Sequence, residues 1–171
     1  MSILFADSNS DLKQEQIYLF GIEYINMPFS YDEEGTKPLS VDFYENTFKP
    51  YLEQGNNIVY VHQGEFYFKS YANLKKAVRR LKTEFPDNTI YLVDSGSTSS
   101  GYAFVLYLSM LKYKTGCNEI DLVNYINKIK KEVVVLFTLN DATQLNKHKI
   151  NVNIDSVLIK PIIKLENNNF E

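Results

Sequence analysis

Residues 58–94, IVYVHQGEFYFKSYANLKKAVRRLKTEFPDNTIYLVD, decide the fold class of this chain. Residues 58–61 and 89–93 are short apolar runs rich in β-branched and aromatic side chains, and each ends at polar residues, so both predict buried strands. Between them, apolar residues recur at helical spacing over 69–84, which predicts an amphipathic helix that ends before Pro86. A strand, a helix and a strand in this order form a βαβ unit with parallel strands.

The same alternation of strand and helix extends in both directions from this unit. Ser40 and Asn118 are the expected N-caps of two of the helices, and Pro50 is expected to end or kink the first of these. We therefore predict an α/β fold with a mostly parallel sheet of about five strands and helices on both faces. The further strands are predicted at 3–6, 22–30 and 133–139, and the further helices at 11–20, at 40–52, before 113 and after 118.

The length of 171 residues favours one folded unit. Residues 1–150 are predicted to form a single α/β domain. Residues 151–171, which contain Pro161, are predicted to form a strand-like C-terminal tail.

Composition excludes several classes of function. The net charge of −3 offers no general affinity for nucleic acid. No segment approaches the roughly 18 consecutive apolar residues of a membrane span. The single cysteine, Cys117, permits no intramolecular disulfide and suits the cytoplasm. Two histidines and one cysteine far apart in the sequence do not form a zinc site, and no cofactor is indicated.

Polar residues follow the predicted strands, and in open α/β sheets ligands bind beyond the carboxyl ends of the strands. The loop from Ser95 to Gly101 either presents backbone N–H groups to a phosphate or carboxylate, or is an ordinary loop with capping serines. His62 is either a ligand contact or general base, or a buried hydrogen-bonding residue. Because no nucleophile–base pair is visible, we predict that the chain is not an enzyme, with phosphotransfer as a weaker alternative.

Several segments, taken in order, resemble the DegV family. Residues 5–12, FADSNSDL, are similar to that family's opening Thr-Asp-Ser-x-x-Asp-Leu, and residues 93–95 resemble its Val-Asp-Ser segment. Residues 159–163, IKPII, resemble its Ile-Lys-Pro-Ile-Leu strand. The resemblance implies binding of a long-chain fatty acid between two domains, and in some members a role as an acyl carrier for a separate kinase.

The departures from the family pattern fall on its head-group contacts. The Thr-Thr-Ser-Gln-Pro segment that should follow residues 43–44 is absent. In the loop after the third strand, Ser70 lies near the family's threonine position and the binding serine is replaced. Lys149 stands in place of the arginine of a Gly-Gly-Arg turn, and lysine lacks the bidentate geometry of arginine. The family's second domain would begin after residue 163.

Two hypotheses follow. The first is a DegV-like lipid-binding or acyl-carrier module with a weakened head-group site. The second is a non-catalytic interaction domain that has lost lipid binding and contacts a second copy or a separate partner through residues 66–68 and the basic face of helix 69–84. The candidate ligand contacts are Ser8, His62, Ser70, Ser95, Ser97 and Lys149.

Overall fold

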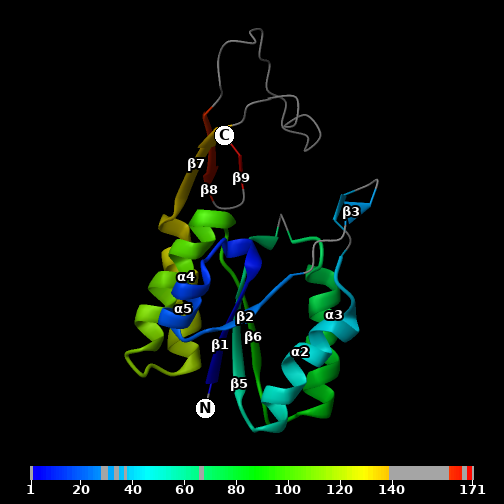
Figure 1. The fold of residues 1–171 in the computed structure, drawn as a ribbon. Coiled ribbons are helices and arrows are strands. Elements are labelled where there is room, and N and C mark those ends of the chain that lie inside the picture. Colours follow the sequence, from blue (N-terminus) through cyan, green and yellow to red (C-terminus); the bar gives the residue numbers. More distant parts are fainter. Residues whose placement is uncertain are drawn as a thin grey trace.

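The centre of the fold is a parallel sheet of four strands in the order β2-β1-β5-β6 (Figure 1). The computed structural model describes residues 2–27, 31–32, 35–36, 38–65, 68–138, 162–166 and 169–170. The strands of this sheet are β1 (Ser2–Asp7), β2 (Glu23–Ile25), β5 (Asn57–His62) and β6 (Ile90–Asp94). Every neighbouring pair in it is parallel, which confirms the predicted α/β class.

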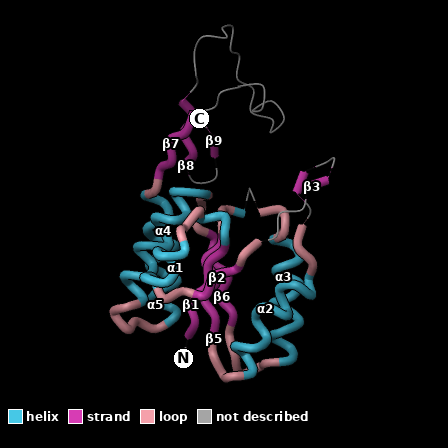
Figure 2. Tube along the Cα trace, viewed as in Figure 1, coloured by secondary structure: helices cyan, strands magenta, loops and turns pink. Residues whose placement is uncertain are grey.

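Helices cover both faces of this sheet, as predicted (Figure 2). One face carries α1 (Gln14–Phe20), α4 (Ser99–Tyr113) and α5 (Glu119–Ile129), and the other carries α2 (Val41–Glu53) and α3 (Tyr71–Glu84). Successive residues of a strand point to opposite faces, so β5 supplies Val59 and Val61 to the first core and Ile58 and Tyr60 to the second. Two buried faces explain why the central residues of β1, β5 and β6 form continuous apolar runs.

The predicted helix caps are present. The Ser40 hydroxyl accepts a hydrogen bond of 3.1 Å from the backbone N–H of Phe43 at the start of α2. The Asn118 side-chain oxygen accepts one of 2.9 Å from the N–H of Asp121 at the start of α5. Pro50 does not end α2, which continues to Glu53, because a proline in the last turn removes only one helical hydrogen bond.

Substituting Asn118 with alanine is expected to lower the free energy of unfolding by about 1 kcal/mol, because an N–H at the start of α5 loses its acceptor. Urea denaturation measures this change. Asn124→Ala is the matched control, since Asn124 is exposed in the middle of the same helix and should shift stability by less than about 0.5 kcal/mol. Equal effects of the two substitutions would contradict the capping role.

The buried face of α5 differs from the one expected from the sequence. Helical spacing in the sequence predicts Ile120, Val123, Ile126 and Ile129 as the inner residues, but Ile120 is 62% exposed. Leu122 is buried instead, together with Ile126 and Ile129. Both sets satisfy helical spacing, and only the packing against α4 selects between them.

The fifth predicted strand belongs to a second sheet. It forms β7 (Val134–Thr138), which pairs antiparallel with β8 (Ile162–Glu166), and β8 pairs with β9 (Asn169–Phe170). The parallel sheet therefore has four strands rather than about five. In β7, exposed Val134 and Leu136 alternate with half-buried Val135 and Phe137, which is the pattern of a strand buried on one face. The sequence of β7 does not show this alternation, because its apolar residues are continuous.

The second sheet lies beyond the carboxyl ends of the parallel strands, on the side of α4 and α5 (Figure 1). The strand predicted in the C-terminal tail is present as β8, and it pairs with a strand from the preceding part of the chain. The boundary predicted at residue 150 lies outside the described residues and stays a prediction. The Asp-Glu-Glu-Gly run at residues 32–35 predicts a turn, and the strands β3 (Tyr31–Asp32) and β4 (Gly35–Thr36) pair antiparallel in this region. None of the described helices has the length and apolarity needed to cross a bilayer.

Candidate ligand-binding site

The carboxyl edge of the parallel sheet gathers most of the candidate residues. His62 ends β5 directly opposite Asp94, the last residue of β6. The loops that follow are joined, because the N–H of Ser95 donates to the His62 carbonyl at 3.0 Å and the N–H of Gly64 donates to the Ser97 carbonyl at 2.6 Å. Ser70 precedes α3 as its N-cap residue, and Ser8 follows β1 in the 3-10 turn Ser8–Ser10.

A buried carboxyl group, Asp7, holds the centre of this edge. Its oxygens accept hydrogen bonds from the backbone N–H of Asn9 at 2.9 Å, the Asn9 side-chain amide at 2.7 Å and the Tyr60 hydroxyl at 2.6 Å. The Tyr102 hydroxyl donates to the Val61 carbonyl, its nearest acceptor, and accepts from the N–H of Asp7 at 3.2 Å. Asp7 is thus bonded to β5 through its side chain and to α4 through its backbone N–H.

Burial sets the ionisation of this network. Desolvation raises the pKa of Asp7 above the usual range of a carboxyl group, although the hydrogen bonds from Tyr60 and Asn9 oppose the rise. Burial, together with the nearby Asp7, holds the pKa of both Tyr60 and Tyr102 well above 10, so both hydroxyls stay protonated. The sequence offered one signal for Asp7, its place directly after an apolar strand, but no signal for its tyrosine partners.

His62 is fully buried, and its hydrogen bonds define its tautomer. Nδ1 lies 2.7 Å from the Gln63 carbonyl oxygen, which can only accept, so Nδ1 carries the proton. Nε2 has no hydrogen-bond partner among the described residues. Desolvation lowers the pKa of His62, which keeps the imidazole neutral near pH 7. The rings of Tyr60, Phe68 and Tyr71 surround it at centroid distances of 5.8, 5.4 and 5.1 Å.

Three of the four candidate serines use their hydroxyls within the protein. Ser8 accepts from the N–H of Met27 at 3.1 Å, and Ser70 accepts from the N–H of Leu39 at 2.8 Å. Ser95 donates to the Ser97 carbonyl at 3.1 Å. The Ser97 hydroxyl is buried and has no hydrogen-bond partner among the described residues. Lys149 lies outside the described residues.

The loop after β6 uses its own backbone donors. The N–H of Gly96 donates to the Asp94 carboxylate at 2.8 Å, and that of Ser97 donates to the Ser95 hydroxyl at 3.3 Å. Lys130 reaches over this loop and donates to the Asp94 carbonyl at 3.0 Å. These internal bonds favour the capping interpretation of the loop over an anion cradle. Within the described ranges, no group of three or more His, Cys, Asp or Glu side chains is placed to hold a metal ion.

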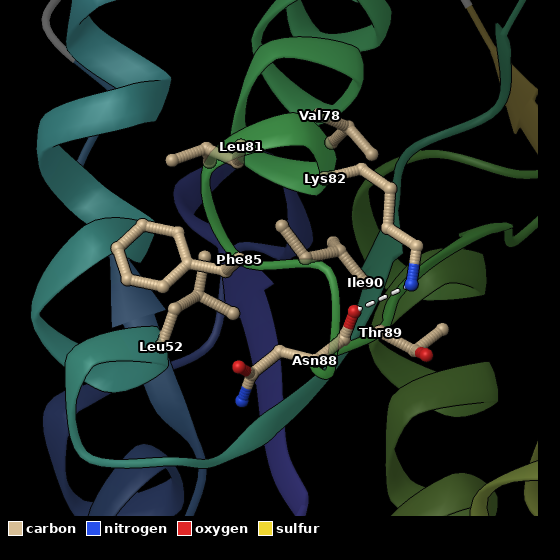
Figure 3. Close-up of a pocket in the computed structure, with 8 residues that line it drawn as sticks. All are labelled: Leu52, Val78, Leu81, Lys82, Phe85, Asn88, Thr89 and Ile90. Carbon is tan, nitrogen blue, oxygen red and sulfur yellow. Dashed lines mark hydrogen bonds between the residues drawn. The ribbon is translucent and has the colours of Figure 1, made fainter.

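A pocket of about 210 Å³ lies at the opposite end of the sheet (Figure 3). Its wall is apolar, and Lys82 spans its rim because the ammonium group donates to the carbonyls of Pro86 and Asn88, both at 2.9 Å. None of the candidate residues that the structure describes lines it. The pocket is lined by Leu52, Val78, Leu81, Lys82, Phe85, Asn88, Thr89 and Ile90.

Comparison with known proteins places this architecture in one family. A family model described as "Uncharacterised protein, DegV family" matches residues 31–171. The chain therefore belongs to the DegV family. No curated protein sequence matches it significantly.

Solved structures agree with this assignment. A stearic-acid-binding protein from Eubacterium ventriosum is 17% identical, with a TM-score of 0.88 over 99% of this chain and 69% of its own. A DegV family protein from Corynebacterium glutamicum is 16% identical, with a TM-score of 0.79 over 99% of this chain and 65% of its own. DegV from Bacillus subtilis, described as a fatty-acid-binding protein, is 14% identical, with a TM-score of 0.73 over 99% of this chain and 69% of its own. The chain thus spans about two thirds of these proteins.

Proposed function

We propose that this chain is a cytoplasmic, non-enzymatic lipid-binding or acyl-carrier module that holds the head group of a long-chain lipid at the carboxyl edge of the parallel sheet. The fatty-acid-binding proteins from E. ventriosum and B. subtilis, which share the fold, support the lipid class. The observation that carries the location is a pair of buried polar atoms at this edge, His62 Nε2 and Ser97 Oγ, neither of which has a hydrogen-bond partner within the described part of the chain. Buried polar atoms normally have a hydrogen-bond partner, which a ligand would supply here.

The head-group site is proposed to be weak. The hydroxyls of Ser8, Ser70 and Ser95 already bond to backbone groups, so a ligand would have to displace those bonds. Lys149 is proposed as an additional contact on the basis of the family pattern alone. We also propose that residues 1–150 act as one domain and that the tail contributes to the second sheet.

Native mass spectrometry after incubation with stearic acid tests lipid binding. One bound stearic acid per chain is expected. Ser97→Ala should weaken uptake about fivefold, the equivalent of one hydrogen bond to a ligand, because Ser97 Oγ has no bond to the described residues that the substitution would remove. Ser109→Ala is the control: this serine is buried in α4, bonded to the Val105 carbonyl and remote from the edge, so uptake should not change.

The alternative function, protein interaction without lipid, is favoured by exposed apolar side chains on α1 and α4. Tyr18 is 87% exposed and Leu19 67%, and Phe104, Tyr107 and Leu111 lie along one side of α4. The two helices meet where the Phe20 and Tyr107 rings contact at 5.8 Å. A bare protein mass without stearic acid, together with a concentration-dependent dimer in the same spectra, would establish this alternative.

A further inference from the structure

The unpartnered nitrogen of His62 is a hydrogen-bond acceptor. Because Nδ1 donates its proton to the Gln63 carbonyl, the neutral ring presents only a lone pair at Nε2. This atom is buried among aromatic rings, where an unsatisfied acceptor is unfavourable. A group that satisfies it must donate a hydrogen bond.

The charges around His62 do not favour an anion there. Asp94 from β6 and Glu65 from the loop after β5 act on the imidazole as negative charges, and Lys130 after α5 acts as a positive charge that is engaged by Asp94. On the helix side, the ring faces Tyr71 of α3 and Phe68, which carry no charge near pH 7. An ionised carboxylate placed at Nε2 would therefore be repelled by the nitrogen lone pair. Among the described residues, no cation other than Lys130 is directed at the ring to offset this repulsion.

A second unpartnered group lies on the same side of the sheet. The Tyr44 hydroxyl of α2 is buried and has no hydrogen-bond partner of good geometry among the described residues, although Ser70 lies close enough to oppose the rise in its pKa. Burial raises the pKa of Tyr44, so its hydroxyl remains a donor. Ring contacts from Tyr44 through Phe48 to Tyr60 and His62 connect the two groups in one aromatic cluster.

We infer that the head-group site takes a neutral hydroxyl head, as in a long-chain alcohol or a monoacylglycerol, in preference to an ionised carboxylate, with the ligand O–H donating to His62 Nε2. This inference rests on the proposed lipid-binding function and names its ligand class. A fatty acid enters the same site only with one proton, carried by its own carboxyl group or by His62. Of the three rings around His62, Tyr71 is partly exposed, whereas Tyr60 and Phe68 are buried.

Competitive displacement of a fluorescent lipid probe by decanol and by decanoic acid, between about pH 6 and about pH 8, tests the inference on the unmodified chain. Decanol should bind with the same affinity throughout. The affinity for decanoic acid should fall about tenfold per pH unit, because the free acid is ionised in this range and the complex holds one more proton.

Two substitutions at His62 sharpen the test. His62→Gln offers an amide N–H donor, so the pH dependence of decanoic acid binding should disappear. His62→Phe removes the acceptor and keeps a flat ring, so decanol should bind about tenfold more weakly. Circular dichroism verifies that each variant is folded, and the pH series on the unmodified chain decides the question if either is not.

The outcomes separate the two proposals. Decanoic acid that binds more tightly than decanol, with no change across the pH range, would overturn the hydroxyl preference and leave lipid binding intact. A bound probe that neither decanol nor decanoic acid displaces would overturn the hydroxyl preference alone. Failure of the probe to bind at any pH would overturn lipid binding itself and the preference with it.

Discussion

Substituting Asp7 with alanine is expected to lower the free energy of unfolding by about 4 kcal/mol, the largest effect of any single polar substitution in this chain. The substitution removes the acceptor for three donors: the backbone N–H and the side-chain amide of Asn9, and the buried hydroxyl of Tyr60. Each donor without an acceptor is unfavourable by about 1–3 kcal/mol when it is buried. Chemical denaturation monitored by circular dichroism measures the change.

Asp87→Ala is the matched control, because Asp87 is an exposed residue between α3 and β6. Its substitution should alter stability by less than about 0.5 kcal/mol. If Asp7→Ala proved equally mild, the buried network would not stabilise the fold.

The stability of Asp7→Ala relative to the natural sequence is also expected to depend on pH. Because burial raises the pKa of Asp7 in the folded state, the folded chain binds the Asp7 proton more tightly than the unfolded chain does. The stability linked to this proton is fully present below about pH 4 and is lost as the pH rises through the raised pKa. The difference in stability between the natural sequence and Asp7→Ala should therefore decrease as the pH rises above about 4. A difference that increased with pH would contradict the raised pKa.

Gly101→Ala is expected to destabilise the chain by about 3 kcal/mol, although alanine in a helix normally stabilises relative to glycine. A Cβ at position 101 in α4 would lie 2.1 Å from the Ser97 hydroxyl oxygen and 2.3 Å from a methyl carbon of Val135 in β7. Both distances are far below van der Waals contact, so the loop, the helix or the second sheet must shift. Thermal and urea denaturation report the loss.

A double substitution tests the mechanism. Val135→Ala removes the β7 methyl groups, so Gly101→Ala should be less damaging in the Val135→Ala background by about 1 kcal/mol or more. Ala103→Gly, in the same turn of α4, is the control and should lower stability by about 1 kcal/mol through helix propensity alone. If the effects of Gly101→Ala and Val135→Ala on stability are additive, the strain in Gly101→Ala arises at Ser97 rather than at the junction between α4 and β7.

The fold class was predictable because its signals are local. The continuous apolar strands β1, β5 and β6, the helical spacing of α3 and the caps Ser40 and Asn118 each depend on residues close in sequence. The strand β7 was placed in the wrong sheet for the opposite reason. Its sequence, VVLFT, fits a buried parallel strand, and its pairing with β8 depends on residues far along the chain.

The sequence by itself determined an α/β chain with a parallel sheet, a polar edge at the ends of its strands, and a resemblance to the DegV family that the family match confirms. The tertiary structure alone decided what that edge can do chemically. Asp7 bonds to Tyr60 across 53 positions, and Asp7 and Tyr102 are joined across 95. His62 Nε2 is a hydrogen-bond acceptor because Nδ1 donates to the Gln63 carbonyl and because the surrounding aromatic rings bury the imidazole. Burial and hydrogen-bond geometry set these properties, and neither is encoded in residues adjacent in sequence.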